Sequence, residues 1–116
     1  MAIREDDSTP IDYLKERVET FVTERNWERY HNPKDIAIAL SVEASELLDI
    51  FKWKDSLNDP TNIPTRTRNA IGDEMADVLI YLLSLSNVMS VDLTQATLRK
   101  MSKNARKYPK RSPRNW

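Results

Sequence analysis

Residues 39–48 read Ala-Leu-Ser-Val-Glu-Ala-Ser-Glu-Leu-Leu, and this stretch decides the fold because its apolar side chains recur with the period of an α-helix. Two acids, Glu43 and Glu46, interrupt it. A spacing of three residues puts both carboxylates on one helix face, one turn apart. The pattern recurs at residues 71–80, Ile-Gly-Asp-Glu-Met-Ala-Asp-Val-Leu-Ile, where Glu74 and Asp77 have the same spacing. We therefore predict two helices that each carry a carboxylate pair in apolar surroundings.

The first pair lies where a core side chain is expected. Glu43 falls in the apolar stripe formed by Ile36, Leu40, Leu47 and Ile50. A single Glu-x-x-Glu on a helix is usually a solvated surface pair, because Glu is a good helix former that is seldom buried. Two pairs on apolar helices joined by one loop can instead face each other. Four buried carboxylates would be prohibitively costly unless a cation lay between them, so we predict a metal site.

The ligand types narrow the choice of metal. The chain has no Cys, and its one histidine, His31, lies outside both acidic pairs. An all-carboxylate site favours Mg²⁺, with Mn²⁺ as a possible substitute, over metals that prefer nitrogen or sulfur ligands. Mg²⁺ commonly bridges protein carboxylates and substrate phosphates. The pattern therefore points to phosphoryl or nucleotidyl chemistry.

Length and composition limit the class of protein. At 116 residues the chain should form one domain, which we place at residues 1–109. A single Gly argues against a turn-rich β fold, and the lack of Cys excludes disulfide and zinc-thiolate frameworks. No apolar run reaches the ~18 residues of a membrane span, and the charged start is not a signal peptide. We expect a cytoplasmic protein that spans no membrane.

The net charge of zero hides a split along the chain. Residues 99–116 hold eight of the 18 basic side chains and no acid, so residues 1–98 hold 10 basic against 18 acidic side chains. The end of this segment, residues 110–116, is expected to be a solvated, disordered basic tail. The first part of the basic segment, residues 99–107, suits a helix that binds anions. We expect no nucleic-acid partner, because no recognised motif is present and the rest of the chain is acidic.

Four helices are predicted. The first spans Pro10 to Trp27, with Thr9 as its N-cap. The second begins at Asn32 and Pro33, with Asp35 in its first turn, and runs to about Trp53. A loop over residues 54–64 is marked by its Asp, Asn and Pro residues. The third helix covers residues 65–89, and its Gly72 would permit close approach of another helix. Asp92, with Gln95 three residues later, caps a fourth helix that ends near Lys107.

This layout predicts an all-α bundle of four helices. The second and third helices carry apolar side chains on more than one side. Four helices of this length cannot cover that surface within one chain, so we expect a homo-oligomer, a dimer or a tetramer built as a dimer of dimers.

Aromatic and basic side chains extend the acidic pairs. Trp53 follows Glu46, and Tyr81 follows Glu74, by seven residues, which restores the same helix face ~10 Å further along. In an antiparallel hairpin the two displacements point in opposite directions, so a broad pocket or a second subunit is needed for both to meet one nucleotide. Trp27 ends the first helix. A tryptophan near a helix end is more often part of a core or an interface.

The fourth helix carries a polar face whose positive charges could bind phosphate. Lys100, Asn104 and Lys107, spaced at four and three, lie on one side and could hold phosphate oxygens. A solvated helix end that complements the macrodipole explains the same pattern equally well.

Five segments in order resemble one known family, the MazG-like all-α nucleoside triphosphate pyrophosphohydrolases, and within it the dCTP pyrophosphatase branch. They are Glu-Arg-Asn-Trp-Glu-Arg-Tyr-His (24–31), Glu-Ala-Ser-Glu-Leu (43–47), Phe-Lys-Trp-Lys (51–54), Asp-Glu-Met-Ala-Asp-Val-Leu-Ile-Tyr (73–81) and Lys-Met-Ser-Lys-Asn-Ala-Arg-Lys-Tyr-Pro (100–109). The likeness covers over three quarters of the chain. It departs at its short N-terminus and at Ala44-Ser45, where the branch often has a Gly.

The resemblance implies hydrolysis of a nucleoside triphosphate between the α and β phosphates, most simply dCTP, with dATP, dUTP or a modified nucleotide as alternatives. It implies Mg²⁺ on both acidic pairs, with Glu43 or Glu46 orienting or deprotonating the attacking water. The base pocket would use Trp27, His31 and Trp53. Tyr81 would contact the sugar, and Lys100, Asn104 and Lys107 the phosphates. A role in nucleotide pool sanitation is the family's suggestion. The alternative from another class is a non-catalytic helical interaction module.

Overall fold

The computed structural model describes residues 3–30 and 32–110, and these form an all-α fold without a strand. Its four α-helices are α1 (Ile11–Glu24), α2 (Pro33–Phe51), α3 (Thr65–Met89) and α4 (Leu93–Lys107). Four short 3₁₀ turns lie between or before them: η1 (Asp6–Ser8), η2 (Glu28–Tyr30), η3 (Asp55–Asn58) and η4 (Pro60–Asn62). The predicted fold class and the number of helices are confirmed.

Two helix starts follow the predicted chemistry. The side chain of Asn32 accepts a hydrogen bond from the Asp35 backbone N–H (2.9 Å) at the start of α2. Asp92 accepts one from the Gln95 N–H (2.8 Å) at the start of α4. Each side chain satisfies a backbone donor that the first helical turn leaves free.

The start of α1 differs from the prediction. Pro10 is the N-cap, with ψ of 152°, and not the first helical residue. The Thr9 side chain makes no capping hydrogen bond, and its hydroxyl oxygen is buried without a partner. The predicted N-cap at Thr9 is therefore wrong by one residue.

The ends of α1 and α2 come earlier than predicted. The helices stop at Glu24 and Phe51, because Asn26 (φ 55°) and Trp53 (φ 63°) adopt the left-handed conformation, which cannot continue a right-handed helix. The predicted loop after α2 is folded into η3 and η4. Asp59 orders it by accepting hydrogen bonds from the Thr61 N–H and hydroxyl, which hold the pKa of Asp59 below its usual range.

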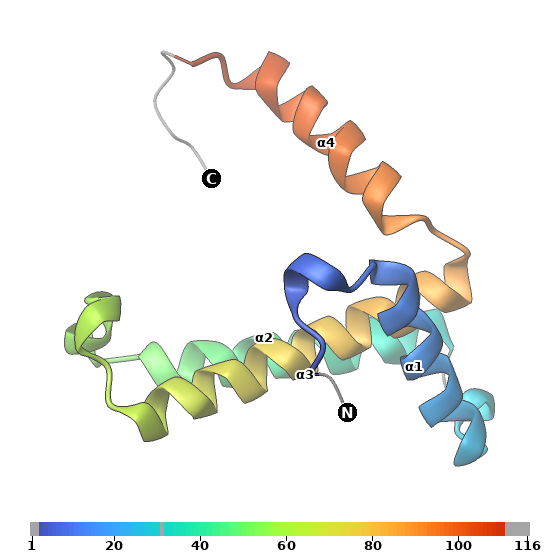
Figure 1. The fold of residues 1–116 in the computed structure, drawn as a ribbon, viewed down its shortest axis with the longest axis horizontal. Coiled ribbons are helices and arrows are strands. Elements are labelled where there is room, and N and C mark those ends of the chain that lie inside the picture. The colour runs from blue at the N-terminus through green and yellow to red at the C-terminus, as the bar shows by residue number, and fades with distance from the viewer. Residues whose placement is uncertain (1–2, 31, 111–116) are drawn as a thin grey trace.

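Helices α2 and α3 lie side by side as an antiparallel hairpin (Figure 1). Ile36 of α2 and Leu83 of α3 are each only 2% exposed. Helix α1 packs on the C-terminal half of α3 and adds Val22 to this core. Two hydrogen bonds tie α1 to the end of α3: Lys15 Nζ donates to the Val91 carbonyl (2.9 Å), and Asn87 Nδ2 donates to the Lys15 carbonyl (3.0 Å).

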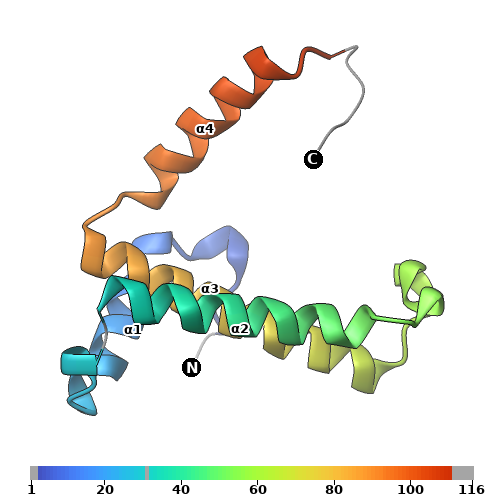
Figure 2. The ribbon, with the colours of Figure 1, turned by 180° about the vertical axis from the view of Figure 1, so that it is seen from behind.

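Helix α4 extends away from the hairpin, as Figure 2 shows from behind. The chain bends by 101° between α3 and α4. Among the described residues no single helix is long and apolar enough to cross a membrane, and only this bent pair meets that test by length and composition. Gly72 does not mediate close helix approach within the chain, since a Cβ built on it would meet no atom within 4 Å.

Candidate metal centre and adjoining cavity

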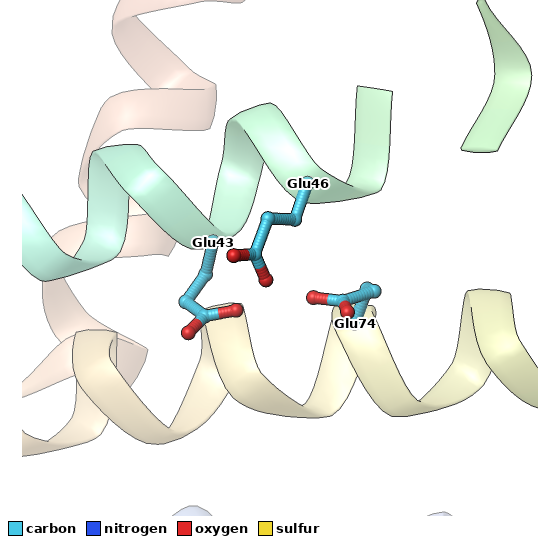
Figure 3. A group of neighbouring side chains, drawn as sticks. All are labelled: Glu43, Glu46 and Glu74. Atoms are coloured by element: carbon cyan, nitrogen blue, oxygen red, sulfur yellow. The ribbon is translucent and has the colours of Figure 1, made fainter. Parts of the chain in front are cut away.

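Three carboxylates meet at the middle of the α2–α3 hairpin. Glu43 and Glu46 project from α2 toward Glu74 on α3, and their carboxylate groups point toward one another (Figure 3). One oxygen from each lies within 4.8 Å of one oxygen from each of the others. The antiparallel pairing of two helices whose carboxylates share the inner face produces this arrangement. The prediction that the two acidic pairs face each other is therefore met for these three residues.

The fourth predicted ligand lies beside this group. Asp77 is one helical turn beyond Glu74, and its negative charge acts on the Glu43 carboxyl. It is not among the three residues whose oxygens converge. Asp77 therefore adds negative charge near the three converging carboxylates, but its own oxygens are not part of that group.

Burial and mutual repulsion make it costly to ionise all three carboxylates at once. The Oε2 atoms of Glu43 and Glu74 are buried and have no hydrogen-bond partner. The pKa of Glu43 is raised from 4.5 to about 7. Desolvation is the largest cause, followed by hydrogen bonds to Glu46 and Glu74 and by the charges of Glu46 and Asp77. These hydrogen bonds require a shared proton, because ionised carboxylates only accept. A divalent cation would satisfy the same oxygens, so the residues fit a hard metal ion.

A cavity of about 760 Å³ opens next to the cluster, between α1 and α3. Four of the predicted site residues contribute to its wall: Trp27, Glu43, Asp77 and Tyr81. Apolar side chains of α1 and α3, among them Leu14, Phe21 and Ile80, complete most of the lining. The cavity thus has an acidic wall and an aromatic wall, and its volume lies in the range of small-molecule sites.

Two cations in this cavity were not predicted. Arg17 and Arg25 of α1 and its C-terminal turn line it together with Glu24. Their spacing from Phe21, four residues in each direction, puts all three side chains on one helix face. That spacing was available in the sequence, but the face could be assigned to the site only after α1 was placed on α3.

The other predicted site residues that the structure describes do not line the cavity within a single copy of the chain. Trp53 is 91% exposed beyond the end of α2, while Trp27 precedes the start of α2. The 19 residues of α2 separate them by ~28 Å at 1.5 Å per residue. Lys100, Asn104 and Lys107 lie on α4, which extends away from the hairpin (Figure 1). His31 falls outside the described residues, as does the tail over residues 111–116.

Comparisons with known proteins relate the chain to one family. The model of the MazG-like family matches residues 38–114. The chain is 43% identical to dCTP pyrophosphatase 1 of Homo sapiens, and 42% identical to that of Mus musculus, over 90 residues. These matches cover 77% of this chain and 53% of each relative, so the chain spans about half the length of the curated relatives it matches. A crystal structure of a pyrophosphatase from Archaeoglobus fulgidus superposes with a TM-score of 0.78 at 37% identity, covering 95% of this chain and 99% of that one.

Proposed function

The chain belongs to the MazG-like family, and on this premise we propose that it is a metal-dependent nucleoside triphosphate pyrophosphohydrolase. The reaction would release pyrophosphate and the nucleoside monophosphate, with dCTP as the first candidate substrate because two similar proteins are named dCTP pyrophosphatase 1. The observation that carries the proposal is the convergence of Glu43, Glu46 and Glu74 within 4.8 Å beside a cavity large enough for a nucleotide. We assign the activity to one domain, residues 1–109.

The carboxylates would hold Mg²⁺, with Mn²⁺ as a substitute. Glu43, Glu46 and Glu74 supply converging oxygens, and Asp77 adds charge from the next turn. When bound, the ion neutralises phosphate charge and acidifies a coordinated water. An oxygen-only donor set suits Mg²⁺ better than zinc or iron.

The side chains divide the remaining work. Glu46 is exposed, whereas Glu43 and Glu74 each direct a buried oxygen into the cluster. We therefore assign to Glu46 the orientation of the attacking water and the acceptance of its proton, with Glu43 as the second candidate. Trp27 would contact the base and Tyr81 the sugar, since both line the cavity beside the acidic wall. His31 completes the proposed base pocket.

A second copy of the chain is the proposed source of Trp53, Lys100, Asn104 and Lys107. Trp53 is 91% exposed beyond the end of α2, and α4, which carries the other three residues, extends away from the hairpin (Figure 2). The radius of gyration is 16.9 Å, against about 13 Å for a compact chain of this length. We propose a dimer, or a tetramer as a dimer of dimers, in which the basic α4 of one copy meets the acidic cavity of another. A cytoplasmic location is the matching expectation for an enzyme acting on free nucleotides.

One experiment tests the activity directly. The protein is incubated with Mg²⁺ and each common dNTP and NTP, and pyrophosphate and orthophosphate are measured separately. We expect pyrophosphate and monophosphate in equal amounts, fastest with dCTP. Faster turnover of dATP, dUTP or a modified nucleotide would correct the substrate but keep the chemistry. Orthophosphate alone would contradict cleavage between the α and β phosphates.

A binding measurement separates an enzyme from a helical interaction module. A non-hydrolysable nucleotide at 100 times its Kd should stabilise the Mg²⁺-loaded protein by ~2.7 kcal/mol, whereas a module without a nucleotide site should show no shift in Tm. Absence of both turnover and shift would favour the module.

A further inference from the structure

The C-terminus of α1 ends in a hydrogen-bonded cap around Asn26, and the proposed chemistry does not use this cap. The Trp27 N–H donates to the Val22 carbonyl (3.1 Å), and the Asn26 N–H donates to the Thr23 carbonyl (3.0 Å). Asn26 itself is left-handed, with φ of 55°. These two hydrogen bonds around one left-handed residue form a Schellman motif, which satisfies the last carbonyls of a helix. The chain is therefore folded back sharply just before Trp27.

This fold-back fixes the position of the Trp27 ring. The residue after the left-handed position of a Schellman motif often packs on the last helical turn. Here Trp27 packs edge-on against Phe21, with ring centroids 5.6 Å apart and planes at 69°. The Arg25 guanidinium lies 3.5 Å from the Phe21 centroid and 5.9 Å from that of Trp27, and it donates to the Phe21 carbonyl (3.1 Å). Trp27 thus has contacts with both Phe21 and Arg25, is 43% exposed and lines the cavity.

The cap depends on one residue type. Left-handed backbone strains every residue that has a Cβ, and Asn tolerates it better than most because its short polar side chain bonds locally. A β-branched residue at this position would favour an extended or frayed end, which releases Trp27 from Phe21.

We propose that Asn26 is a positioning residue for nucleotide binding: its left-handed cap orients Trp27 as a preformed aromatic wall for the planar base. Asn26 itself is neither a lining residue of the cavity nor a member of the carboxylate cluster. It acts through Trp27 alone. The inference rests on the proposed function, because it assumes that the cavity receives a nucleotide. It adds a specific residue that sets affinity without taking part in the chemistry.

The test compares Asn26→Val with Asn26→Gly. Valine disfavours the left-handed backbone, and glycine adopts it without strain, so the pair changes the cap in opposite directions at one position. We expect Asn26→Val to raise KM for dCTP about tenfold, the change that ~1.4 kcal/mol of left-handed strain corresponds to. Its kcat should change less than about twofold, because an interaction equal in ground state and transition state affects KM alone. Asn26→Gly should retain both constants. If Asn26→Val fails to fold, Asn26→Ala replaces it.

A spectroscopic readout makes the test independent of turnover. In a chain whose other tryptophans are replaced by Trp53→Phe and Trp116→Phe, emission reports on Trp27 alone. Adding Asn26→Val to this chain should make Trp27 more accessible to acrylamide quenching, and adding Asn26→Gly should not. Unchanged quenching together with an unchanged KM in Asn26→Val would overturn the proposal, as would a loss confined to kcat. If the unmodified protein cleaves no nucleotide, the proposed function fails instead, while the quenching result still decides whether Asn26 holds Trp27.

Discussion

At the scale of single residues, the position of Glu43 is the main departure from a structural helix. It lies on the face of α2 that packs on α3, where Ile36 is almost fully buried. An aliphatic side chain there would stabilise the hairpin, whereas a carboxylate beside two others costs free energy. A shared proton or a bound cation can offset this cost, and above about pH 7 the proton is lost, so Glu43 lowers the stability of the metal-free protein there.

Removal of single carboxylates should abolish most activity without unfolding the protein. We expect Glu46→Gln and Asp77→Asn each to lower kcat at least ~10²-fold, the usual loss for a general base or a metal ligand. Steady-state pyrophosphate release at saturating Mg²⁺ measures this. Asp73→Asn, which changes an exposed carboxylate outside the cluster, is the matched control and should keep near-normal turnover. Near-normal turnover in Glu46→Gln would show that Glu46 does not orient the attacking water or accept its proton.

The metal-free protein should become less stable as pH rises. The pKa of Glu43 is raised to about 7 in the folded protein, from 4.5, so the folded state holds a proton that the unfolded state has released. Stability should therefore fall between about pH 4.5 and pH 7 and level off above that. Melting in EDTA at pH 5 and pH 8 measures the effect. Glu43→Gln should lose less Tm over this range than the unmodified protein, and an equal loss in both would contradict the assignment.

At the scale of secondary-structure elements, the helix ends determine how the molecule is arranged. Asn26 and Ser90, with φ of 55° and 53°, each end a helix with the same pair of backbone hydrogen bonds. At Ser90 the chain turns by 101° into α4, and Lys15 holds the Val91 carbonyl from α1. These hydrogen bonds therefore help to set the direction in which α4 leaves the end of α3.

Helix α4 should depend strongly on its N-cap. It has 15 residues, a length at which isolated helices are marginal, and it extends away from the hairpin (Figure 1). Asp92→Ala should cost α4 about 1 kcal/mol, because the Gln95 N–H loses its acceptor. Hydrogen exchange should show faster exchange of the α4 amides at unchanged protection of α2 and α3. Asp92→Asn, which keeps the acceptor oxygen, is the control. Equal acceleration in both variants would show that the cap is not responsible.

At the scale of the whole molecule, the described residues bury too little for a chain that stands alone. Only four apolar side chains among them are buried: Val22, Ile36, Leu57 and Leu83. Large apolar side chains remain exposed on α2, α3 and α4, among them Leu48, Met75 and Met101. The acidic part of the chain, residues 1–98, and the basic segment that follows it would attract each other between copies. Apolar coverage and charge therefore both favour self-association.

A charge placed on the apolar face of α4 should weaken that association. Leu98 and Met101 are each 61% exposed and lie on one side of the helix. Met101→Glu should shift the protein toward smaller species in analytical ultracentrifugation and lower activity, because Lys100 and Lys107 would no longer reach the second copy. Lys103→Gln makes the same change of one charge unit on the opposite side of α4 and should leave the mass unchanged. A monomeric unmodified protein with full activity would contradict the shared site.

The sequence alone determined the all-α class and two helices, each with an acidic pair on one face, that can pair as a hairpin, because helical periodicity and N-capping are local properties. Residue spacing was enough to put Glu43 and Glu46 on one helix face. Only the tertiary structure decided which residues share a cavity. It joined Trp27 and Tyr81 to the acidic wall, added Arg17 and Arg25, and separated Trp53 and α4 from them within the chain. Those outcomes depend on how helices pack and where left-handed residues end them, and neither follows from local sequence pattern.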